Sequence, residues 1–402
     1  MPSPSNTTAA PLVPVAEAQQ RLFAAAPPVA AESLPVTDAG GRWASADVHA
    51  RRTQPAADLS AMDGYAIRYD DLPGPWQVIG ESAAGQPYAG TIAPGEAVRI
   101  FTGAALPVGA DAVMVQEEAR RDGTQLILDG EGPTRRGGNV RRRGLDFNEG
   151  DRLIRTGERI TPARIAVAIT GGLAELPVHR RIRVAIAATG NELVPPGTPL
   201  DPLSLPEGNS AMLAAMLSDL PVEIIRLGIL ADDLATLTAA FATVDVDLLV
   251  TTGGASVGDH DLVRPALEAA GGVIDFWRIA LRPGKPMMAG RLGEAMVLGL
   301  PGNPVSAFVT ATLFVRTLIA HLAGASDPLP HTSHALLGED LPTNGPRTDY
   351  LRAEIRDGRA YASTIQDSSM LLTLARSTCL IVRQAGAPPA FAGDSAEILV
   401  IA

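Results

Sequence analysis

Residues 246–271 of the chain read VDLLVTTGGASVGDHDLVRPALEAAG, and this stretch decides the fold class. The run VDLLVTTGG is typical of a buried strand, and the glycine-rich loop GGASVGDHD follows it. The next segment, DLVRPALEAAG, has the spacing of a helix that ends at Gly271. Strand, loop and helix in this order form the repeating unit of a parallel sheet. We therefore predict an α/β domain around this stretch.

The same alternation extends in both directions and indicates a doubly wound α/β domain over residues 181–325. Its sheet is predicted to be parallel and covered by helices on both faces. The further strands are predicted at RVAIAATG (183–190), VEIIRLGIL (222–230), VIDFWRIAL (273–281) and AMVLGLPGN (295–303), and the further helices at 209–220, 232–244 and 304–324.

The flanking regions have a different pattern. Short alternating stretches such as WQVIGES and DAVMVQEE, separated by Gly, Pro and Asp, predict a small β unit over residues 55–143. The strand-like pieces TDYLRAEI, CLIVRQ and AEILVI predict a second β unit at the C-terminus, and VAEAQQRLFAA (15–25) predicts a helix. The first β unit closes with a basic run that is either a solvated face or an anion-facing surface: Arg135, Arg136, Arg141, Arg142 and Arg143.

Composition excludes several classes of protein. The 402 residues include 33 basic and 44 acidic ones, so the net charge is −11 and general nucleic-acid binding is not expected. A single cysteine, Cys379, excludes a disulfide framework and agrees with a reducing compartment such as the cytoplasm. No basic segment precedes Arg21, so we expect no secretory signal. The longest apolar segment, 305–322, contains Arg316 and His321 and predicts a buried helix rather than a membrane span.

Polar and glycine-rich loops follow every predicted strand of the α/β domain. Ligands bind open α/β sheets at the carboxyl ends of the strands, so five such loops in succession indicate one composite site. These loops are Thr189-Gly190-Asn191-Glu192, Asp232-Asp233, the segment from Gly253 to Asp261, Arg282-Pro283-Gly284-Lys285-Pro286, and Pro301-Gly302-Asn303-Pro304.

Each loop also has a purely structural interpretation. The glycine-rich loop suits a phosphate or another oxyanion, but it can equally be a tight turn with Asp261 as the helix N-cap. Lys285 is either a fixed cation or an ordinary surface lysine. Asn303 is well placed as an N-cap before Pro304, and Asp232 or Asp233 can simply cap the next helix.

The carboxylates on this rim would repel an anionic ligand unless a cation lies between them. Mg²⁺ accepts one or two carboxylates together with phosphate oxygens, so the residues indicate metal-assisted cleavage of a phosphate linkage. The sequence contains no HExxH or GxxxxGK[ST] motif, which argues against zinc catalysis and P-loop nucleotide hydrolysis.

Taken in order, these motifs resemble the MoeA family of molybdopterin molybdenumtransferases, whose core is shared with the C-terminal part of gephyrin. The similarity covers almost the whole chain. It is carried by Ser60-Ala61-Met62-Asp63-Gly64-Tyr65-Ala66, Thr102-Gly103-Ala104, Gly109-Ala110-Asp111-Ala112-Val113, Gly144-Leu145-Asp146, Thr189-Gly190-Asn191-Glu192-Leu193, GGASVGDHD, Arg282-Pro283-Gly284-Lys285-Pro286 and Leu300-Pro301-Gly302-Asn303-Pro304-Val305-Ser306-Ala307.

The resemblance implies a reaction in molybdenum cofactor biosynthesis. Family members take adenylylated molybdopterin and molybdate, cleave the adenylate in a Mg²⁺-dependent step and release AMP. The catalytic positions carried over are Asp63, Asp146, Glu192, Asp261 and Lys285, and the Mg²⁺ ligands are Glu192, Asp232 and Asp261. The positions carried over for binding the pterin, nucleotide or molybdate are Thr102, Gly253, Gly254, Ser256, Arg278, Arg282, Pro301, Gly302 and Asn303.

The resemblance also implies an architecture. It predicts an elongated homodimer whose chains each contain a linking domain (10–54 with 144–180), an inserted β domain (55–143), a molybdopterin-binding domain (181–325) and a C-terminal β domain (326–402). A molybdopterin adenylyltransferase is a candidate partner, and neither a nucleic acid nor a membrane is expected. Because Asp63 lies far along the chain from the predicted rim, we expect the two-fold partner to supply it.

The chain departs from the family pattern at a few positions. Arg282 and Arg278 stand where lysine is usual, Asn191 where many members have Asp, and Glu207-Gly208-Asn209 where Asp-Ser-Asn is usual. Arginine keeps the charge and adds bidentate oxyanion binding. Two alternatives stay open: a molybdopterin adenylyltransferase, and a non-catalytic paralogue that binds molybdopterin or a partner protein.

Overall fold

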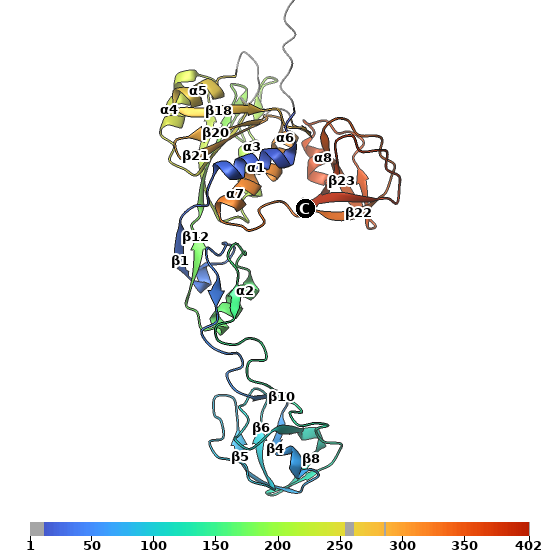
Figure 1. Cartoon of the computed structure of the whole chain (residues 1–402). Helices are drawn as coiled ribbons and strands as arrows, with labels where there is room; N and C mark the ends of the chain where they lie inside the picture. The colour runs from blue at the N-terminus through green and yellow to red at the C-terminus, as the bar shows by residue number, and fades with distance from the viewer. Residues whose placement is uncertain (1–11, 254–260, 285–286, 402) are drawn as a thin grey trace, which may run out of the picture.

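The computed structural model describes residues 12–253, 261–284 and 287–401, and Figure 1 shows that the chain is elongated. An α/β unit and a C-terminal β unit lie side by side at one end of the molecule. A distal β unit lies at the other end, and a narrow linking region joins the two ends. The multidomain α/β fold class predicted from the sequence is confirmed, whereas the exact domain boundaries stay predictions.

The α/β unit is built on a six-stranded sheet in the order β16-β13-β17-β21-β20-β18. Strands β16, β13, β17 and β21 are parallel, but β20 runs antiparallel to both of its neighbours. The prediction of an all-parallel sheet is therefore wrong at this edge. The bounds are β13 Ile182–Thr189, β16 Val222–Leu230, β17 Leu248–Thr252, β18 Gly272–Trp277, β20 Met287–Leu292 and β21 Ala295–Leu300.

Strand β20 was absent from the sequence prediction for a physical reason. Its residues, MMAGRL, include no β-branched or aromatic side chain, so propensity gives little signal for a strand. A two-residue turn at Gly293-Glu294 joins β20 to β21, and only antiparallel strands can be connected so briefly. Gly293 has a positive φ of 58°, which suits such a turn.

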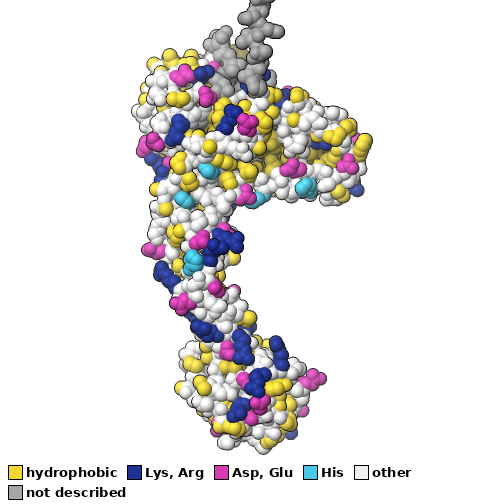
Figure 2. All heavy atoms as spheres, in the orientation of Figure 1, with side chains coloured by type: hydrophobic (Ala, Val, Ile, Leu, Met, Phe, Trp, Pro, Cys, Tyr) yellow, Lys and Arg dark blue, Asp and Glu magenta, His cyan; other side chains and the backbone are white. Residues whose placement is uncertain are grey.

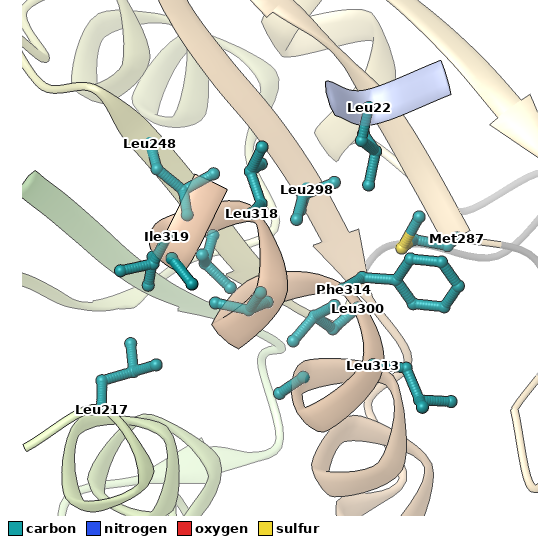
Figure 3. Packing of buried hydrophobic residues seen from close by; sticks show 14 of the residues in the cluster. Leu22, Leu217, Leu248, Met287, Leu298, Leu300, Leu313, Phe314, Leu318 and Ile319 are labelled. Atoms are coloured by element: carbon teal, nitrogen blue, oxygen red, sulfur yellow. The ribbon is translucent and has the colours of Figure 1, made fainter. Parts of the chain in front are cut away.

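Helices cover both faces of this sheet because alternate strand residues point to opposite sides. Leu249 packs toward helices α4 and α5, whereas Leu248 and Val250 pack toward the other helices (Figure 3). The bounds are α1 Val15–Ala25, α3 Asn209–Met216, α4 Leu234–Ala242, α5 Val263–Ala269, α6 Pro304–Thr310, the π-helical turn η4 Ala311–Val315, and α7 Arg316–Leu322.

Segments α6, η4 and α7 form one continuous helix, Pro304–Leu322. Among the described residues, this is the helix long and apolar enough to cross a membrane, yet 78% of its apolar window is buried inside the molecule. Its Leu313, Phe314, Leu318 and Ile319 form part of the main core (Figure 3). The predicted buried helix is confirmed.

Helix α1 lies in the segment that the sequence assigned to the linking domain, but its buried face contacts the α/β unit. Gln19 donates a hydrogen bond to the Leu313 carbonyl (2.8 Å), and Phe23 stacks on His321 with ring centroids 4.7 Å apart. Just before α1, the Val13 N–H donates to the Arg278 carbonyl (2.8 Å). The N-terminal helix is therefore joined to elements near the end of the α/β unit.

The linking region is formed by two segments of chain that are distant in sequence. Strand β1 (Ala31–Pro35) pairs antiparallel with β12 (Glu175–His179), and β2 (Val48–His49) pairs with β11 (Arg152–Ile154). Helix α2 (Pro162–Thr170) packs beside them, with Thr161 as a side-chain N-cap. This pairing agrees with a two-segment linking unit.

The distal unit is a six-stranded sheet in the order β7-β4-β6-β5-β9-β8, with the short pair β3 and β10 beside it. Its core contains Tyr65, Trp76 and Met114. The bounds are β3 Leu59–Ser60, β4 Gly64–Ile67, β5 Trp76–Ser82, β6 Glu96–Ile100, β7 Ala112–Val115, β8 Ala119–Asp122, β9 Gln125–Leu128 and β10 Val140–Arg141.

The C-terminal sheet has the order β19-β23-β24-β22-β26-β25, and a further β23–β25 pairing closes five of its strands on themselves. Strand β19 (Leu281–Arg282) comes from the predicted α/β segment but pairs with Thr348 and Asp349 of β23. The two units at this end are therefore joined by a strand as well as by the chain connection. The other bounds are β22 Ser333–Leu337, β23 Thr348–Arg356, β24 Arg359–Ala362, α8 Leu371–Arg376, β25 Cys379–Arg383 and β26 Ser395–Val400.

Candidate functional site

The predicted loops meet at one edge of the α/β sheet. The carboxyl ends of the parallel strands β13, β16, β17 and β21 share this edge. The Arg282–Gly284 turn reaches the same edge by a different route. It precedes β20, whose first residues lie beside the carboxyl end of β21, with Met288 opposite Gly299. For the described residues, the loops therefore start from one edge of the sheet, although one loop enters at the amino end of an antiparallel strand.

Close backbone approach brings the loops after β13, β17 and β21 together. A Cβ atom at Gly253 would lie 2.4 Å from the Thr189 carbonyl oxygen, and Gly253 has a φ of +83°, so only glycine fits there. A Cβ atom at Gly302 would lie 3.5 Å from Gly253 Cα. Asn209 donates from Nδ2 to the Gly302 carbonyl (2.8 Å). The loops after β13, β17 and β21 are therefore packed closely against one another at this edge.

The two neighbouring aspartates after β16 have different roles. Asp233 is the N-cap of α4, and its carboxylate accepts a hydrogen bond from the Thr236 N–H (2.7 Å). This bond lowers the pKa of Asp233. Asp232 instead faces the loop after β13: its carboxylate accepts from the Asn191 N–H (3.3 Å), and its own N–H donates to Asn191 Oδ1 (3.1 Å). The structure assigns the cap to Asp233 and leaves Asp232 on the rim.

Two further rim carboxylates lie on either side of this pair in the sequence. Glu192 is exposed, and its carboxylate folds back over Gly190, where a Cβ atom would meet Glu192 Oε2 at 2.7 Å. Asp261 Oδ1 accepts a hydrogen bond from the Val263 N–H (3.2 Å), although Leu262 is the N-cap residue of α5 by position. Asp261 thus makes a local helix-start contact without occupying the N-cap position.

The altered Glu207-Gly208-Asn209 segment keeps a carboxylate at the start of α3. Glu207 Oε1 accepts from the Ser210 N–H (2.8 Å), while Gly208 is the N-cap by position. The longer glutamate therefore supplies a hydrogen bond of the kind that a side chain at the cap would make. Asn209 is left to contact Gly302, as described above.

The Pro301-Gly302-Asn303 loop contacts a C-terminal segment that sequence reasoning missed. Asn303 is the N-cap of α6 by position, but its side chain makes no cap hydrogen bond. Its Nδ2 donates instead to Ser368 Oγ (3.1 Å), and the Val305 N–H donates to the Ser368 carbonyl (3.2 Å). The polar run Gln366-Asp367-Ser368-Ser369 is the sequence signal that points to this segment.

Arg282 has a partner that its sequence position did not reveal. Its guanidinium forms an ion pair with Asp349 of β23, whose side chain is 5% exposed, while the Arg282 side chain is 54% exposed. Burial raises the pKa of Asp349, and the positive charge of Arg282 opposes that rise. Arg282 therefore stabilises a buried carboxylate while much of its own surface stays accessible.

The remaining predicted residues at this end are placed only in part. The Arg278 carbonyl accepts from the Val13 N–H, and Arg278 itself follows the end of β18. Gly254, Ser256 and Lys285 lie outside the described residues. Their predicted roles therefore rest on the sequence alone.

Two further predicted residues, Asp63 and Thr102, contact each other in the distal unit. Asp63 Oδ1 accepts two hydrogen bonds from Thr102, one from its N–H and one from its hydroxyl, both 2.7 Å long. The backbone bond from Thr102 contributes most to lowering the pKa of Asp63, and the hydroxyl adds to it. Asp146 is exposed on the segment after β10, where its N–H donates to the Gln54 carbonyl (3.1 Å). Asp63 and Thr102 thus form a preorganised carboxylate.

One chain does not bring Asp63, Thr102 or Asp146 to the sheet edge. Strand β4 directly follows Asp63, and strand β10 precedes Asp146. Both strands lie at the opposite end of the molecule from β20 and β21 (Figure 1). In the space-filling view, arginine side chains gather where the distal unit meets the linking region (Figure 2). Exposed arginines of this junction include Arg51, Arg52, Arg141 and Arg143.

The described residues contain no group of three or more His, Cys, Asp or Glu side chains arranged to hold a metal ion. The predicted ligands Glu192, Asp232 and Asp261 thus do not form a preformed cage. Mg²⁺ usually keeps several waters and binds one or two carboxylates plus substrate phosphates, so an open carboxylate rim fits that ion.

Comparison with known proteins identifies the family. The models that match are "MoeA N-terminal region (domain I and II)" over residues 13–172, "Probable molybdopterin binding domain" over 185–321, and "MoeA C-terminal region (domain IV)" over 334–401. The molybdopterin molybdenumtransferase of Haemophilus influenzae is 36% identical over 384 residues, which cover 92% of this chain and 94% of that protein. The chain belongs to the MoeA family.

Other MoeA proteins extend the similarity. Molybdopterin molybdenumtransferase 2 of Mycobacterium tuberculosis is 37% identical over 78% of this chain and 81% of its own length. The Bacillus subtilis molybdopterin molybdenumtransferase is 31% identical over 97% and 94%. A crystal structure of the molybdopterin biosynthesis MoeA protein from Pyrococcus horikoshii OT3 superimposes with a TM-score of 0.83 at 26% identity, covering 97% of this chain and all of that one.

Proposed function

We propose that the chain is a molybdopterin molybdenumtransferase that acts in molybdenum cofactor biosynthesis. It takes adenylylated molybdopterin and molybdate, inserts molybdenum at the dithiolene, and releases AMP. The supporting observation is the convergence of glycine turns, carboxylates and Arg282 at one sheet edge, in a chain that is 36% identical to a protein of this name over 92% of its length.

Glu192, Asp232 and Asp261 would hold Mg²⁺ together with phosphate oxygens of the substrate. When bound, Mg²⁺ neutralises phosphate charge and polarises the bond to be cleaved. Asp232 is held toward the rim by its exchange of hydrogen bonds with Asn191. Glu192 is exposed, so it can turn toward a ligand at this edge.

Basic and glycine-rich groups of the same edge would bind the anionic parts of the substrates. Arg282 presents an accessible guanidinium for molybdate, and we assign Lys285 the same task. Lys285 is the single lysine among the 33 basic residues. The loop containing Gly253, Gly254 and Ser256, together with Pro301, Gly302 and Asn303, would supply backbone N–H groups and an amide to the pterin and its phosphate.

A two-fold dimer would complete the site. Asp63, Thr102 and Asp146 lie at the far end of their own chain from the rim (Figure 1), so we assign them to the rim of the partner subunit. The ionised, doubly hydrogen-bonded Asp63 would then orient water or a magnesium-bound group beside the phosphate. Arg141 and Arg143 would add positive charge beside it.

The cytoplasm is the proposed location because a dithiolene persists as a thiolate-like group in a reducing compartment. A molybdopterin adenylyltransferase is the proposed partner, since such an enzyme produces the adenylylated substrate. Direct transfer between the two would protect the intermediate from hydrolysis by bulk water.

The proposal is tested by supplying the purified chain with adenylylated molybdopterin, Mg²⁺ and molybdate, then measuring AMP and active cofactor. We expect both products, and we expect both to disappear when Mg²⁺ is chelated. A parallel reaction with molybdopterin and ATP distinguishes the adenylyltransferase alternative. Binding of adenylylated molybdopterin without AMP release would instead support the scaffold alternative and refute turnover.

The lone lysine permits a second test. An amine acylating reagent can modify only Lys285 and the N-terminal amine, and peptide mass spectrometry separates the two. We expect acylation of Lys285 to stop the molybdate-dependent reaction, and molybdate to slow that acylation. Lys285→Arg keeps the charge and removes the amine, so it should retain activity after the same treatment. Inactivation of the Arg variant would place the sensitive group elsewhere.

A further inference from the structure

Three threonines of the helix Pro304–Leu322 differ in how their hydroxyls are used. Thr312 donates to the Phe308 carbonyl (2.9 Å), and Thr317 donates to the carbonyls of Leu313 (2.8 Å) and Phe314 (3.1 Å). This is the usual arrangement, because a helical threonine hydroxyl can reach the carbonyl three or four residues earlier.

Thr310 does not follow this arrangement. It is 1% exposed, and its Oγ1 has no hydrogen-bond partner within the described part of the chain. A buried hydroxyl without a partner costs free energy, so such groups require an explanation in a functional protein. The π-helical turn Ala311–Val315 begins directly after Thr310, and such turns are frequent at functional sites.

The Thr310 hydroxyl lies beside the turn that carries Arg282. A Cβ atom at Gly284 would be 3.4 Å from Thr310 Oγ1 and 2.5 Å from Leu281 Cδ1. Gly284 has a φ of +129°, and the lack of a side chain there leaves its backbone next to the hydroxyl. Arg282, two residues earlier, holds the accessible guanidinium and the ion pair with Asp349.

We propose that Thr310 is a positioning residue for the oxyanion-binding turn Arg282–Gly284. When a tetrahedral oxyanion binds Arg282, the Thr310 hydroxyl forms a hydrogen bond with the backbone at Gly284 and fixes the turn in its bound position. The free energy lost by burying an unpaired hydroxyl is then recovered on binding. The inference rests on the proposed function, because it takes molybdate as the oxyanion.

The test compares Thr310→Val, Thr310→Ser and Thr317→Val in the full-length protein. Valine keeps the shape of threonine and removes only the hydroxyl. Molybdate affinity is measured by titration calorimetry and as the KM for molybdate in AMP release, and stability as the unfolding midpoint without ligand. We expect Thr310→Val to weaken molybdate about fivefold, the effect of one hydrogen bond, without lowering the midpoint.

The two control variants separate molybdate affinity from stability. Thr310→Ser restores the hydroxyl and should bind molybdate like the original chain. Thr317→Val loses a satisfied hydrogen bond in the same helix, so it should lower the unfolding midpoint and leave molybdate affinity unchanged. The affinity for adenylylated molybdopterin should be unaffected in all three variants.

Two results would overturn the assignment. If Thr310→Val lowers the unfolding midpoint and leaves molybdate affinity unchanged, Thr310 is structural only. If it weakens molybdate and adenylylated molybdopterin equally, it does not act on the Arg282 turn. Failure of the unmodified chain to bind molybdate would refute the proposed function itself, whereas normal binding that is insensitive to Thr310→Val refutes only the role of Thr310.

Discussion

Different contacts hold the side chains in two regions of the molecule. These regions are the sheet edge of the α/β unit and the Asp63–Thr102 pair of the distal unit. At the edge, residues from five loops meet because the strands that carry them share one sheet. In the distal unit, Asp63 and Thr102 come from separate motifs, and Thr102 donates two short hydrogen bonds to the Asp63 carboxylate. The carboxylates at the sheet edge do not form a preformed metal cage, whereas Asp63 already has its two hydrogen bonds but lies at the far end of the chain from that edge (Figure 1). Under the proposed function, these two regions would be the two parts of a site that a two-fold dimer joins.

The largest expected effect concerns this division. Asp63→Asn and Asp261→Asn should each abolish AMP release, because each removes a charge from one part of the site. Asparagine keeps the oxygen that accepts from the Val263 N–H, so the fold around position 261 should survive. When the two inactive homodimers exchange subunits, about half the dimers are mixed and one site in each is free of mutation. About a quarter of all sites should then be active.

The mixing experiment separates the two arrangements. If Asp63 serves the rim of its own chain, every site in every dimer carries one lesion and mixing restores nothing. Sedimentation of the unmixed protein provides the control, because a monomer would refute the shared site directly. Circular dichroism of both variants checks that they remain folded.

Arg282→Ala should weaken the response to molybdate roughly 10- to 150-fold, or about 1.5–3 kcal/mol, while changing pterin binding much less. The same change removes the guanidinium paired with buried Asp349 and leaves only the charges of Arg347 and Arg383 to act on it, so the pKa of Asp349 should rise further above its unfolded value. When the pKa of a carboxyl is higher in the folded than in the unfolded state, the free energy of unfolding falls as the pH rises above the unfolded pKa. The stability deficit of the variant should therefore be larger at pH 7 than at pH 4.

Arg282→Lys is the matched control for this change, since it keeps a positive charge beside Asp349. It should restore most of the stability at pH 7, and its molybdate affinity shows how much of the effect requires a guanidinium. Equal losses for molybdate and pterin in Arg282→Ala would place Arg282 outside the oxyanion site.

A smaller effect is expected at the distal pair. Thr102→Val removes the hydroxyl bond to Asp63 but keeps the backbone bond, so the pKa of Asp63 should rise while staying below its ordinary value. Asp63 would then be protonated at a higher pH, and activity would fall earlier on the acidic side. Thr102→Ser should retain the original profile. If Thr102→Val and the original chain have the same pH–rate profile, protonation of Asp63 does not cause the loss of activity at low pH.

The smallest expected effect on stability is at Asp233, and it distinguishes this residue from its neighbour Asp232. Asp233→Ala removes the N-cap of α4 and should lower the unfolding midpoint by no more than a few degrees, with AMP release unchanged. Asp232→Ala should show the reverse, with activity lost and the midpoint preserved. Loss of activity in Asp233→Ala at a temperature where it is fully folded would contradict the division of roles.

Sequence patterns predicted those strands and helices whose local hydrophobic periodicity matches the observed structure. Strands such as β13 and β17 are mostly apolar and buried, and the glycine turns that follow them mark the shared edge. Strand β20 escaped prediction because Met, Ala and Gly carry little strand propensity. The Arg282–Asp349 pair and the Asn303–Ser368 contact escaped it because each joins residues more than 60 positions apart, and no local pattern records such contacts.

The placement of helix α1 has a consequence for synthesis of the protein on the ribosome. Val13, just before α1, bonds to Arg278, which is made 265 residues later, and Gln19 and Phe23 contact residues made later still. At about 5–20 residues per second, the nascent helix remains without its partner for roughly 13–53 s. Helix α1 is thus made well before the residues it docks against, so its apolar face needs shielding from aggregation while the linking and distal units fold.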